Sequence, residues 1–397
     1  MFQKLKNIYH GFQALIAGVF YGFPSRRLKV LGVTGTDGKT TTTHLIYHIL
    51  KTSGKRASMI STVYARVGER EYETGLHTTT PSPFLIQRML REAVKHGDEY
   101  FVLETTSHAL DQNRVWGVKY EASVITNITH EHLDYHKTYE DYVRAKARLL
   151  KNSKVSFINE EDGSYKLLQI QSPKSKGYNS QVKIIDGVAG LTSFNRQNFA
   201  AAYSVCKTLG LTDGEILTAM KTFELPKGRL ELVYDGDFKI IIDFAHTPNA
   251  FLRLLPEIKK QYLKGKGKLI HIFGAAGERD QSKRGLMGDA SGQFSDLVIL
   301  TEEDYRSEDV MEICNQIAAG LENKGLKKVT YDGLRNSEES VYSIVVNREK
   351  AIKVAIQAVR QDDVIVITGK SHEKSLARGS VEYPWSEHEA VKNALRS

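Results

Sequence analysis

Short apolar runs alternate with amphipathic stretches along nearly the whole chain, and this alternation predicts strands separated by helices. The predicted buried strands are 28–33, 100–103, 123–125, 240–242, 269–272 and 364–367. The predicted helices include 41–50, 139–150 and 214–223. Such an order is typical of an α/β protein with mainly parallel sheets. We divide it into an amphipathic segment, 1–28, and two α/β domains, 29–226 and 227–397, with the boundary near Pro226 and Gly228.

A glycine-rich turn joins the first predicted strand to the first helix. Backbone N–H groups of such a turn, together with the helix N-terminus, bind anions. Lys39 adds a cation for outer phosphates, and the Thr40 hydroxyl can ligate a nucleotide-bound magnesium ion. The strict phosphate-loop pattern has glycine where this chain has Val33, so a plain tight turn is the alternative. The nucleotide-binding candidates here are Gly35, Thr36, Asp37, Gly38, Lys39, Thr40 and Thr41.

Two further polar sites follow predicted strands. Glu104 stands at the carboxyl end of strand 100–103, where an open parallel sheet presents ligands, and its carboxylate could hold magnesium opposite Thr40. A solvated acid at a strand end is the alternative. Residues 126–136 contain three histidines and two acids, but no cysteine is near and the spacing matches no common zinc pattern.

The phosphate turn, the sequence EHLDYH at 131–136 and the sequence AKA at 145–147 together resemble the Mur ligases, which couple ATP cleavage to amide-bond formation. The resemblance implies a P-loop-type ATP-binding domain followed by a smaller Rossmann-like α/β domain. It implies ATP and two Mg²⁺ ions, with Lys146 carbamylated so that it becomes a carboxylate-like ligand. A lysine on an amphipathic helix is otherwise most often solvated. The implied metal ligands are Thr40, Glu104, His132 and Lys146.

Other motifs resemble the peptidoglycan tripeptide synthetases within this family. The sequences TTP at 79–81 and ETTSHALDQNR at 104–114 imply contacts with a muramoyl peptide by Thr79, Thr80, Thr106, Gln112 and Arg114. Motifs in the carboxyl half imply contacts with the nucleotide by Asn198, Arg229, Asp243 and His246. They also imply contacts with the incoming amino acid by Arg279, Arg306, Gly369 and Glu373. Each motif alone could be a strand end with a turn, so the ordered series carries the inference.

One motif departs from the family in a way that concerns the amino acid. Members that use meso-diaminopimelate have the sequence DNPR, whereas this chain has EDYR at 303–306. Arg306 is kept, but an acid replaces the neutral asparagine. The added negative charge favours an amino acid with a cationic far end, such as lysine, over one that ends in a carboxylate.

The amino-terminal region differs more. The family usually begins with a domain that holds uridine diphosphate, but here the phosphate turn lies close to Met1, so we expect that domain to be absent. Residues 8–23 are apolar and aromatic, and they are flanked by lysines and arginines. They are too short and interrupted for a membrane span, and no cleavage site indicates a signal peptide. Packing on the first domain and peripheral membrane contact are the two alternatives.

Composition agrees with a cytoplasmic enzyme. The chain of 397 residues is 41% hydrophobic, which is enough for two cores. A net charge of +8 suits nucleotides and acidic peptides, and no nucleic-acid partner is expected. Cys206 and Cys314 form no pair motif, which indicates a reducing compartment. We expect a monomer, and we expect a loop at 169–181, where polar residues gather.

The predicted reaction is ATP-dependent phosphorylation of a muramoyl-peptide carboxylate, followed by attack of an amino group on the acyl phosphate. Three rival interpretations remain. One is a folylpolyglutamate-synthase-like ligase, a second is a Mur-type ligase that acts on a lipid-linked or other acidic acceptor, and a third is a nucleotide-binding scaffold without activity. The motifs TTP and SHAL disfavour the first, and His132, Lys146 and Glu373 disfavour the third.

Overall fold

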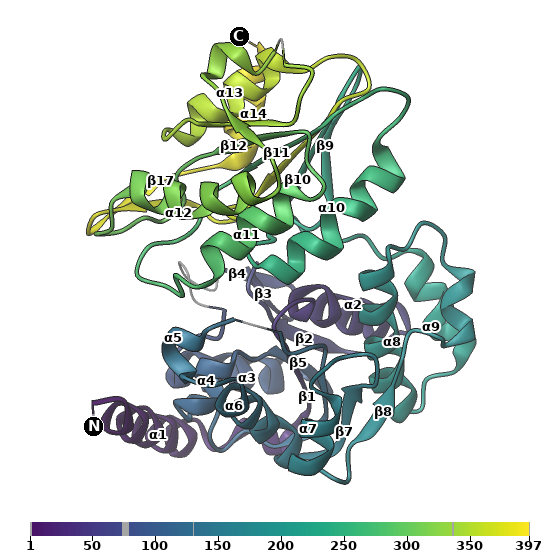
Figure 1. Cartoon of the computed structure of the whole chain (residues 1–397). Helices are drawn as coiled ribbons and strands as arrows, with labels where there is room; N and C mark the ends of the chain where they lie inside the picture. Colours follow the sequence, from purple (N-terminus) through teal and green to yellow (C-terminus); the bar gives the residue numbers. More distant parts are fainter. Residues whose placement is uncertain (1, 74–78, 130, 336, 397) are drawn as a thin grey trace. The chain divides into compact units, whose positions relative to one another are not determined.

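The computed structural model describes residues 2–73, 79–129, 131–335 and 337–396 (Figure 1). The chain forms two compact units. Unit 1 consists of residues 1–129 and 135–226, and unit 2 consists of residues 130–134 and 227–397. The amino-terminal segment 1–28 thus belongs to unit 1. No helix in the described ranges has the length and hydropathy needed to cross a membrane.

Unit 1 contains one eight-stranded sheet in the order β4-β3-β2-β5-β1-β6-β7-β8. Six neighbouring strands, β2, β5, β1, β6, β7 and β8, run parallel, and β3 and β4 are added antiparallel at the edge beside β2. The order reverses at β1, which lies between β5 and β6, and such a switch point creates a ligand crevice at the carboxyl ends of the strands. The strands are β1 (Lys29–Thr34), β2 (Ala57–Ile60), β3 (Ala65–Val67), β4 (Arg70–Tyr72), β5 (Tyr100–Glu104), β6 (Tyr120–Ile125), β7 (Ser153–Asn159) and β8 (Lys176–Tyr178).

Helices cover both faces of this sheet (Figure 1). Successive residues of a strand point to opposite faces, so Leu31 and Val33 pack in one core with helices α2 and α8, and Val30 packs in another with helix α3. The helices are α1 (Phe2–Tyr21), α2 (Lys39–Thr52), α3 (Pro83–His96), α4 (Ser107–Asp111), α5 (Leu133–His136), α6 (Tyr139–Lys151), α7 (Tyr165–Gln171), α8 (Ser193–Thr208) and α9 (Asp213–Lys221), with short 3₁₀ helices at Pro24–Arg27 and Lys183–Gly187.

Unit 2 contains a seven-stranded sheet in the order β13-β14-β12-β11-β15-β10-β9, in which only β9 is antiparallel. A separate hairpin pairs β16 with β17. The strands are β9 (Glu231–Asp235), β10 (Lys239–Asp243), β11 (Leu269–Phe273), β12 (Leu297–Leu300), β13 (Lys327–Lys328), β14 (Val341–Ile344), β15 (Val364–Thr368), β16 (Ser375–Arg378) and β17 (Val381–Pro384). Isoleucine-rich strands such as β10 are buried on both faces, as is typical of parallel sheets.

The helices of unit 2 pack on this sheet and enclose its core. Ile242 and Ile367 from the strands meet Ile352 and Ala355 from helix α13 in one cluster of buried side chains. The helices are α10 (Pro248–Tyr262), α11 (Lys283–Gly292), α12 (Val310–Asn323), α13 (Arg348–Ala358) and α14 (Glu387–Arg396), with a 3₁₀ turn at Tyr331–Gly333.

The predicted fold class is confirmed, and the predicted strands and helices occur within a few residues of their expected bounds. The predicted loop at 169–181 is correct for residues 172–175 and 179–181. It is wrong for the rest, which contains the end of α7 and the edge strand β8, paired in parallel with β7. A lysine and a glycine in a three-residue edge strand give little hydrophobic signal, because such a strand is specified by pairing rather than by burial.

Candidate active site

The glycine-rich turn of unit 1 lies between β1 and α2 and is shaped by close packing. Gly38 caps α2 in the left-handed region, with φ 79°. A Cβ atom at this position would lie 2.2 Å from Oδ1 of Asn198, so a larger residue would clash as well as strain the backbone. The structure therefore places the nucleotide candidate Asn198 directly against the turn, where α8 begins.

Two residues at the end of β6 hold the turn in place. The Thr126 hydroxyl donates to the Asp37 carbonyl at 2.6 Å, and the Asp37 N–H donates to Oδ1 of Asn127 at 2.9 Å. The Thr36 N–H donates to the Asn127 carbonyl at 2.8 Å. Sequence reasoning assigned no role to Thr126 and Asn127. Their position directly after a strand next to β1 was the available signal.

Two lysine ammonium groups point at the turn. Nζ of Lys39 donates to the Thr36 carbonyl at 2.7 Å, and Nζ of Lys146 donates to the Gly35 carbonyl at 2.6 Å. Lys146 is only 1% exposed, and its ammonium lies 4.6 Å from the centre of the Tyr142 ring. Within the described ranges Lys39 forms no ion pair. Both cations thus contact backbone carbonyl oxygens of a turn suited to phosphate.

Thr40 and Glu104 meet as predicted. The Thr40 hydroxyl donates to Oε1 of Glu104 at 3.0 Å, and both residues are buried. Thr62 completes the group, because its hydroxyl donates to Oε1 at 2.7 Å and its N–H donates to Oε2 at 2.8 Å. Thr62 was missed from the sequence, although it too follows a strand of the same sheet. Hydroxyl and carboxylate oxygens are the ligands that magnesium prefers.

The candidate acceptor ligands form a second group beside Glu104. The Thr80 hydroxyl donates to the Glu104 carbonyl at 3.2 Å, and the Thr106 N–H donates to the Thr80 hydroxyl at 2.9 Å. Nη1 of Arg114 donates to the Thr80 carbonyl at 2.9 Å, and its Nε donates to Oε1 of Gln112 at 2.8 Å. Thr79 is half-buried, and residues 74–78 lie outside the described ranges.

The histidine-rich segment is divided between the units. His132 is half-buried, has φ 58° and belongs with residues 130–134 to unit 2, where the neighbouring Glu131 accepts from Nζ of Lys283 at 3.0 Å. His136 belongs to unit 1 and lies 3.0 Å from the Ser107 hydroxyl. Burial, and then the charge of Lys146, lower the pKa of His136 to about 4. Across the described ranges, no three His, Cys, Asp or Glu side chains are arranged to hold a metal ion by themselves.

The nucleotide candidates of unit 2 lie just before β9 and at the carboxyl end of β10. The Arg229 guanidinium stacks 4.7 Å from the centre of the Phe244 ring, and its Nη1 donates to the Gly228 carbonyl. The Asp243 carboxylate accepts from the N–H groups of Leu230 and Ala245, at 2.8 and 2.7 Å. His246 Nδ1 lies 2.8 Å from the Phe244 carbonyl.

The amino-acid candidates of unit 2 differ among themselves in their surroundings. Arg279 is exposed, whereas Arg306 donates to the Gly277 carbonyl at 2.6 Å. Glu373 pairs with Lys370, whose ammonium also binds Asp304 at 2.8 Å. Glu373 also lines a cavity of about 430 Å³. A Cβ atom on Gly369, which has φ 102°, would lie 2.7 Å from Oε2 of Glu303.

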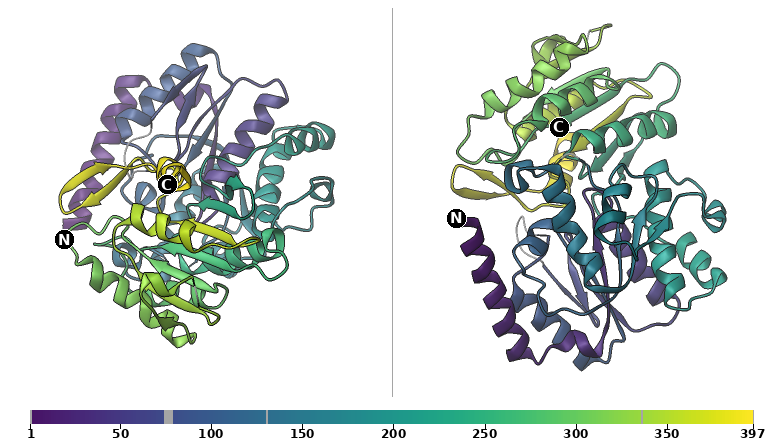
Figure 2. Two further views of the ribbon diagram at one scale, coloured as in Figure 1. Left: turned by 90° about the horizontal axis from the view of Figure 1, so that it is seen from above. Right: turned by 60° about the horizontal axis from the view of Figure 1, so that its bottom comes forward.

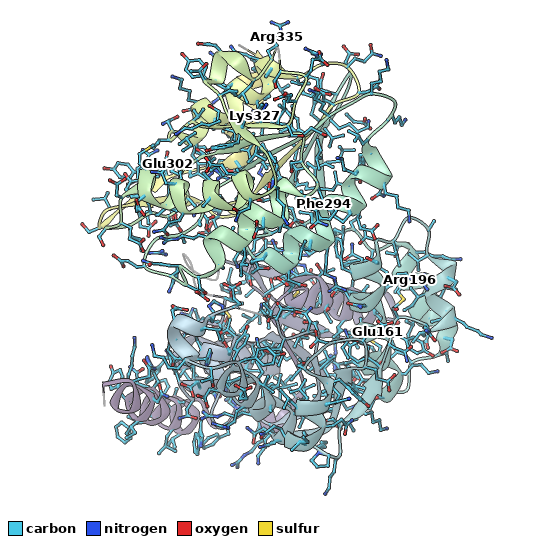
Figure 3. All side chains as sticks on the ribbon, viewed as in Figure 1. Glu161, Arg196, Phe294, Glu302, Lys327 and Arg335 are labelled. Carbon is cyan, nitrogen blue, oxygen red and sulfur yellow. The ribbon has the colours of Figure 1, made fainter. Side chains whose placement is uncertain are left out.

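A buried ion-pair network stands near these candidates and was not foreseen. Arg348 and Glu387 are both 0% exposed and bind each other through Nη2 and Oε1 at 2.6 Å. Glu302, labelled in Figure 3, binds Arg378 at 2.6 Å. Arg348 also donates to the carbonyls of Glu302 and Thr368. Unit 2 therefore neutralises its buried cations with its own carboxylates.

The comparisons with known proteins agree with this geometry. The family model described as the Mur ligase middle domain matches residues 33–213, and the model described as the Mur ligase, glutamate ligase domain matches residues 228–371. The UDP-N-acetylmuramoyl-L-alanyl-D-glutamate--2,6-diaminopimelate ligase of Aquifex aeolicus is 37% identical over 95% of this chain and 79% of its own length. The UDP-N-acetylmuramyl-tripeptide synthetase of Roseiflexus sp. is 34% identical over 96% of this chain and 81% of its own length.

Solved structures are similar in fold. A UDP-N-acetylmuramoyl-L-alanyl-D-glutamate--2,6-diaminopimelate ligase, 26% identical, matches with a TM-score of 0.57 over 93% of this chain and 78% of that chain. A Mycobacterium tuberculosis folylpolyglutamate synthase complexed with ADP and AMPPCP matches with a TM-score of 0.71 over 91% of this chain and 93% of that chain. Its identity is only 14%, so this likeness concerns the fold alone.

Proposed function

Because the chain belongs to the Mur ligase family, we propose that it joins an amino acid to the terminal carboxylate of a muramoyl peptide, at the expense of ATP, in peptidoglycan precursor synthesis. ATP phosphorylates the carboxylate, the amino group of the incoming amino acid attacks the acyl phosphate, and ADP and phosphate are released. The reaction needs no covalent intermediate on a side chain.

The observation that carries the proposal is the contact of Thr40 with Glu104, next to a glycine-rich turn whose carbonyl oxygens accept from Lys39 and from Lys146 of helix α6. The 3.0 Å hydrogen bond brings a hydroxyl and a carboxylate oxygen together, and this donor set fits a nucleotide-bound Mg²⁺. Such an ion supplies positive charge that offsets the charge of the phosphates. We assign Thr40 and Glu104 to hold it, with Thr62 fixing the orientation of the Glu104 carboxylate.

Lys39 acts on the phosphates by its positive charge. Its ammonium donates to the Thr36 carbonyl of the turn, and a phosphate oxygen bound by the turn would lie within reach of the same group. We propose that Lys146 is carbamylated in the active enzyme and contributes, with His132, to a second magnesium site. Burial of Lys146 at 1% exposure supports this, because a shielded amine exchanges its modification slowly with water.

The group of Thr80, Thr106, Gln112 and Arg114 is proposed to bind the acceptor. Arg114 is held at both ends of its guanidinium by neutral acceptors, so its positive charge is available to the carboxylates of an acidic peptide. Burial lowers the pKa of Arg114 somewhat, but its pKa starts so high that the side chain stays charged at physiological pH. Thr79 is proposed to extend this group.

In unit 1 we propose that Asn198 binds the nucleotide. In unit 2 we propose that Arg229, Asp243 and His246 bind the nucleotide and that Arg279, Arg306, Gly369 and Glu373 bind the amino acid. Glu303 refines this assignment. Its Oε2 atom is inaccessible and makes no hydrogen bond to any described residue. Burial, and then the nearby Asp304 carboxylate, raise the pKa of Glu303. A cationic group from the substrate would relieve both effects, so we propose an amino acid with a cationic far end, such as lysine.

The decisive experiment measures ADP release for a matrix of acceptors and amino acids. We expect turnover with a muramoyl dipeptide and lysine, and weaker turnover with meso-diaminopimelate. Comparing free, uridine-linked and lipid-linked muramoyl peptides identifies the acceptor. Glu303→Gln should reduce the preference for lysine without reducing ATP binding. Turnover with folate and glutamate, but with no muramoyl peptide, would overturn the proposal.

We also propose that the enzyme works in the cytosol. Cys206 and Cys314 are both buried free thiols, and burial raises the pKa of each, so neither is a reactive thiolate at neutral pH. A reporter fusion that requires a reducing compartment for fluorescence would check this location.

A further inference from the structure

Helix α1 presents its large apolar side chains to the outside of unit 1. Seven of them are exposed, by 38% to 74% of their surface: Ile8, Tyr9, Phe12, Leu15, Ile16, Val19 and Phe20. They recur at helical spacing and form one continuous stripe, which we call the α1 outer face. Figure 2 shows α1 lying along the outside of this unit in both views. Contiguous exposed apolar surface of this kind marks a binding surface.

The opposite side of α1 is attached to unit 1 by small and polar residues. Ala14, Ala17 and Gly18 are buried, and α1 packs along α3. Nδ2 of Asn7 donates to Oδ2 of Asp111 at 2.9 Å. A helix that only covered a domain would bury its large apolar residues and expose its polar ones. Here the arrangement is reversed, so the core of unit 1 does not explain the apolar residues.

An aromatic and basic cluster lies next to the carboxyl end of α1, where the Phe23 ring packs near Gly18. The ring of Phe23 lies 6.5 Å from that of Trp116, which is 47% exposed, and the guanidinium of Arg26 lies 4.7 Å from the Phe23 ring centre. Arg27 is also exposed. The backbone N–H of Lys119, an exposed residue, donates to the Ser25 hydroxyl, so Lys119 lies beside this cluster.

Charge identifies the occupant of this surface. The first acidic residue of the chain is Asp37, and before it stand Lys4, Lys6, Arg26, Arg27 and Lys29. A second copy of the chain would bring like charges together in either orientation of two α1 helices, which opposes a dimer. An anionic bilayer instead matches the cations with lipid headgroups and takes up the apolar side chains, with tryptophan and tyrosine at the interface.

We propose that the α1 outer face is a peripheral membrane-binding site for anionic phospholipid bilayers, with α1 parallel to the surface and Arg26, Arg27 and Lys119 on the headgroups. The inference does not depend on the proposed ligase reaction, because binding to lipid requires neither ATP nor an acceptor. If the ligase reaction also holds, the site would keep the enzyme at the membrane surface.

The test is sedimentation of the full chain with vesicles of phosphatidylglycerol and phosphatidylcholine, and with vesicles of phosphatidylcholine alone. We expect binding to the anionic vesicles, weaker binding at high salt and little binding to the neutral ones. Phe12→Ser combined with Phe20→Ser should weaken binding on the order of tenfold or more, because two aromatic side chains no longer enter the bilayer. Ile170→Ser, at a residue that is 74% exposed on α7, is the matched control and should bind like the parent chain.

Charge reversal separates the headgroup contribution. Arg26→Glu combined with Arg27→Glu should reduce binding to anionic vesicles by about tenfold or more, whereas Lys174→Glu combined with Lys176→Glu, two exposed lysines elsewhere in unit 1, should have a much smaller effect. Circular dichroism checks that all variants are folded. Absence of vesicle binding, or binding that the α1 variants leave unchanged, would overturn the proposal. So would a dimer in sedimentation velocity that Phe12→Ser and Phe20→Ser dissociate, since a second copy would then cover the face.

Discussion

The candidate sites of the two units treat positive charge in opposite ways. In unit 1, the Lys39 ammonium donates to the carbonyl oxygen of Thr36, which carries only partial charge. In unit 2, Lys370 and Arg348 are bound to full carboxylates, among them Asp304 and Glu387. A cation that contacts only a carbonyl oxygen gains much interaction free energy when a phosphate binds beside it. A cation already paired with a carboxylate gains little.

This difference teaches how to separate a binding site from a supporting network. A charge without a counter-charge among the described residues, as at Lys39, predicts a ligand of opposite sign, and buried ion pairs predict a role in holding structure. Glu303 is the exception within unit 2, because its Oε2 atom lacks a partner among the described residues. Substitutions in unit 1 should therefore change activity with little effect on stability, and substitutions in the unit 2 network should do the reverse.

The largest effect is expected for Lys39→Ala. Loss of a cation on the transferred phosphate should lower kcat by about a thousandfold or more, on the scale of other lysine and arginine contacts in phosphoryl transfer. The melting temperature should stay within a degree or two, because Lys39 forms no ion pair with a described residue. Lys51→Ala, at an exposed position of the same helix, is the control. Normal turnover of a folded Lys39→Ala protein would show that Lys39 does not act on the transferred phosphate.

Arg348→Met should be the most damaging change in unit 2. It leaves the Glu387 carboxylate buried without its partner, and such a change costs about 3 to 5 kcal/mol of unfolding free energy. Replacing both residues, Arg348→Met with Glu387→Leu, should recover much of this loss. Lys327→Met, in an exposed pair with Glu339, should change stability very little. Urea unfolding measures all three. A neutral Arg348→Met variant would show that the network is not structural.

Lys146→Ala should reduce turnover by about a hundredfold. Added acetate or formate should restore part of the activity, because a small carboxylate could occupy the place of the proposed carbamate. Lys151→Ala lies near the end of the same helix at an exposed position and should be fully active. A loss that no carboxylate restores would mean that Lys146 acts as an ammonium group, held on the Gly35 carbonyl.

The smallest expected effects are on the pH dependence of folding stability, through one buried histidine in each unit. Burial lowers the pKa of His136 to about 4 and that of His271 to about 3. Both pKa values are below that of histidine in an unfolded chain, so each neutral histidine favours folding fully above about pH 6.5 and less as the pH falls, toward 4 for His136 and toward 3 for His271. Replacing either residue with glutamine should flatten the decline of stability between pH 6.5 and 4. An unchanged slope in both variants would show that other groups cause it.

Much of the fold was predictable from local patterns. Strand β10 is a run of isoleucines, and helix α9 begins with a capping box formed by Thr212 and Glu215, so both are specified within a few residues. Strand β8 was missed because pairing with β7 defines it. The meeting of Thr40 with Glu104 was predictable because both follow neighbouring strands, and the same rule would have found Thr62.

The sequence by itself determined the α/β class, the phosphate turn, the ordered motifs of the family and the apolar character of residues 8–23, because each depends on neighbours along the chain. Only the tertiary structure decided which charged side chains have partners and which large apolar side chains are exposed. It placed Lys146 on Gly35, joined Arg348 to Glu387, left Oε2 of Glu303 without a described partner and turned the large residues of α1 outward. The reason is physical: burial and charge pairing depend on distances between residues that are far apart in sequence, and those distances exist only in the folded chain.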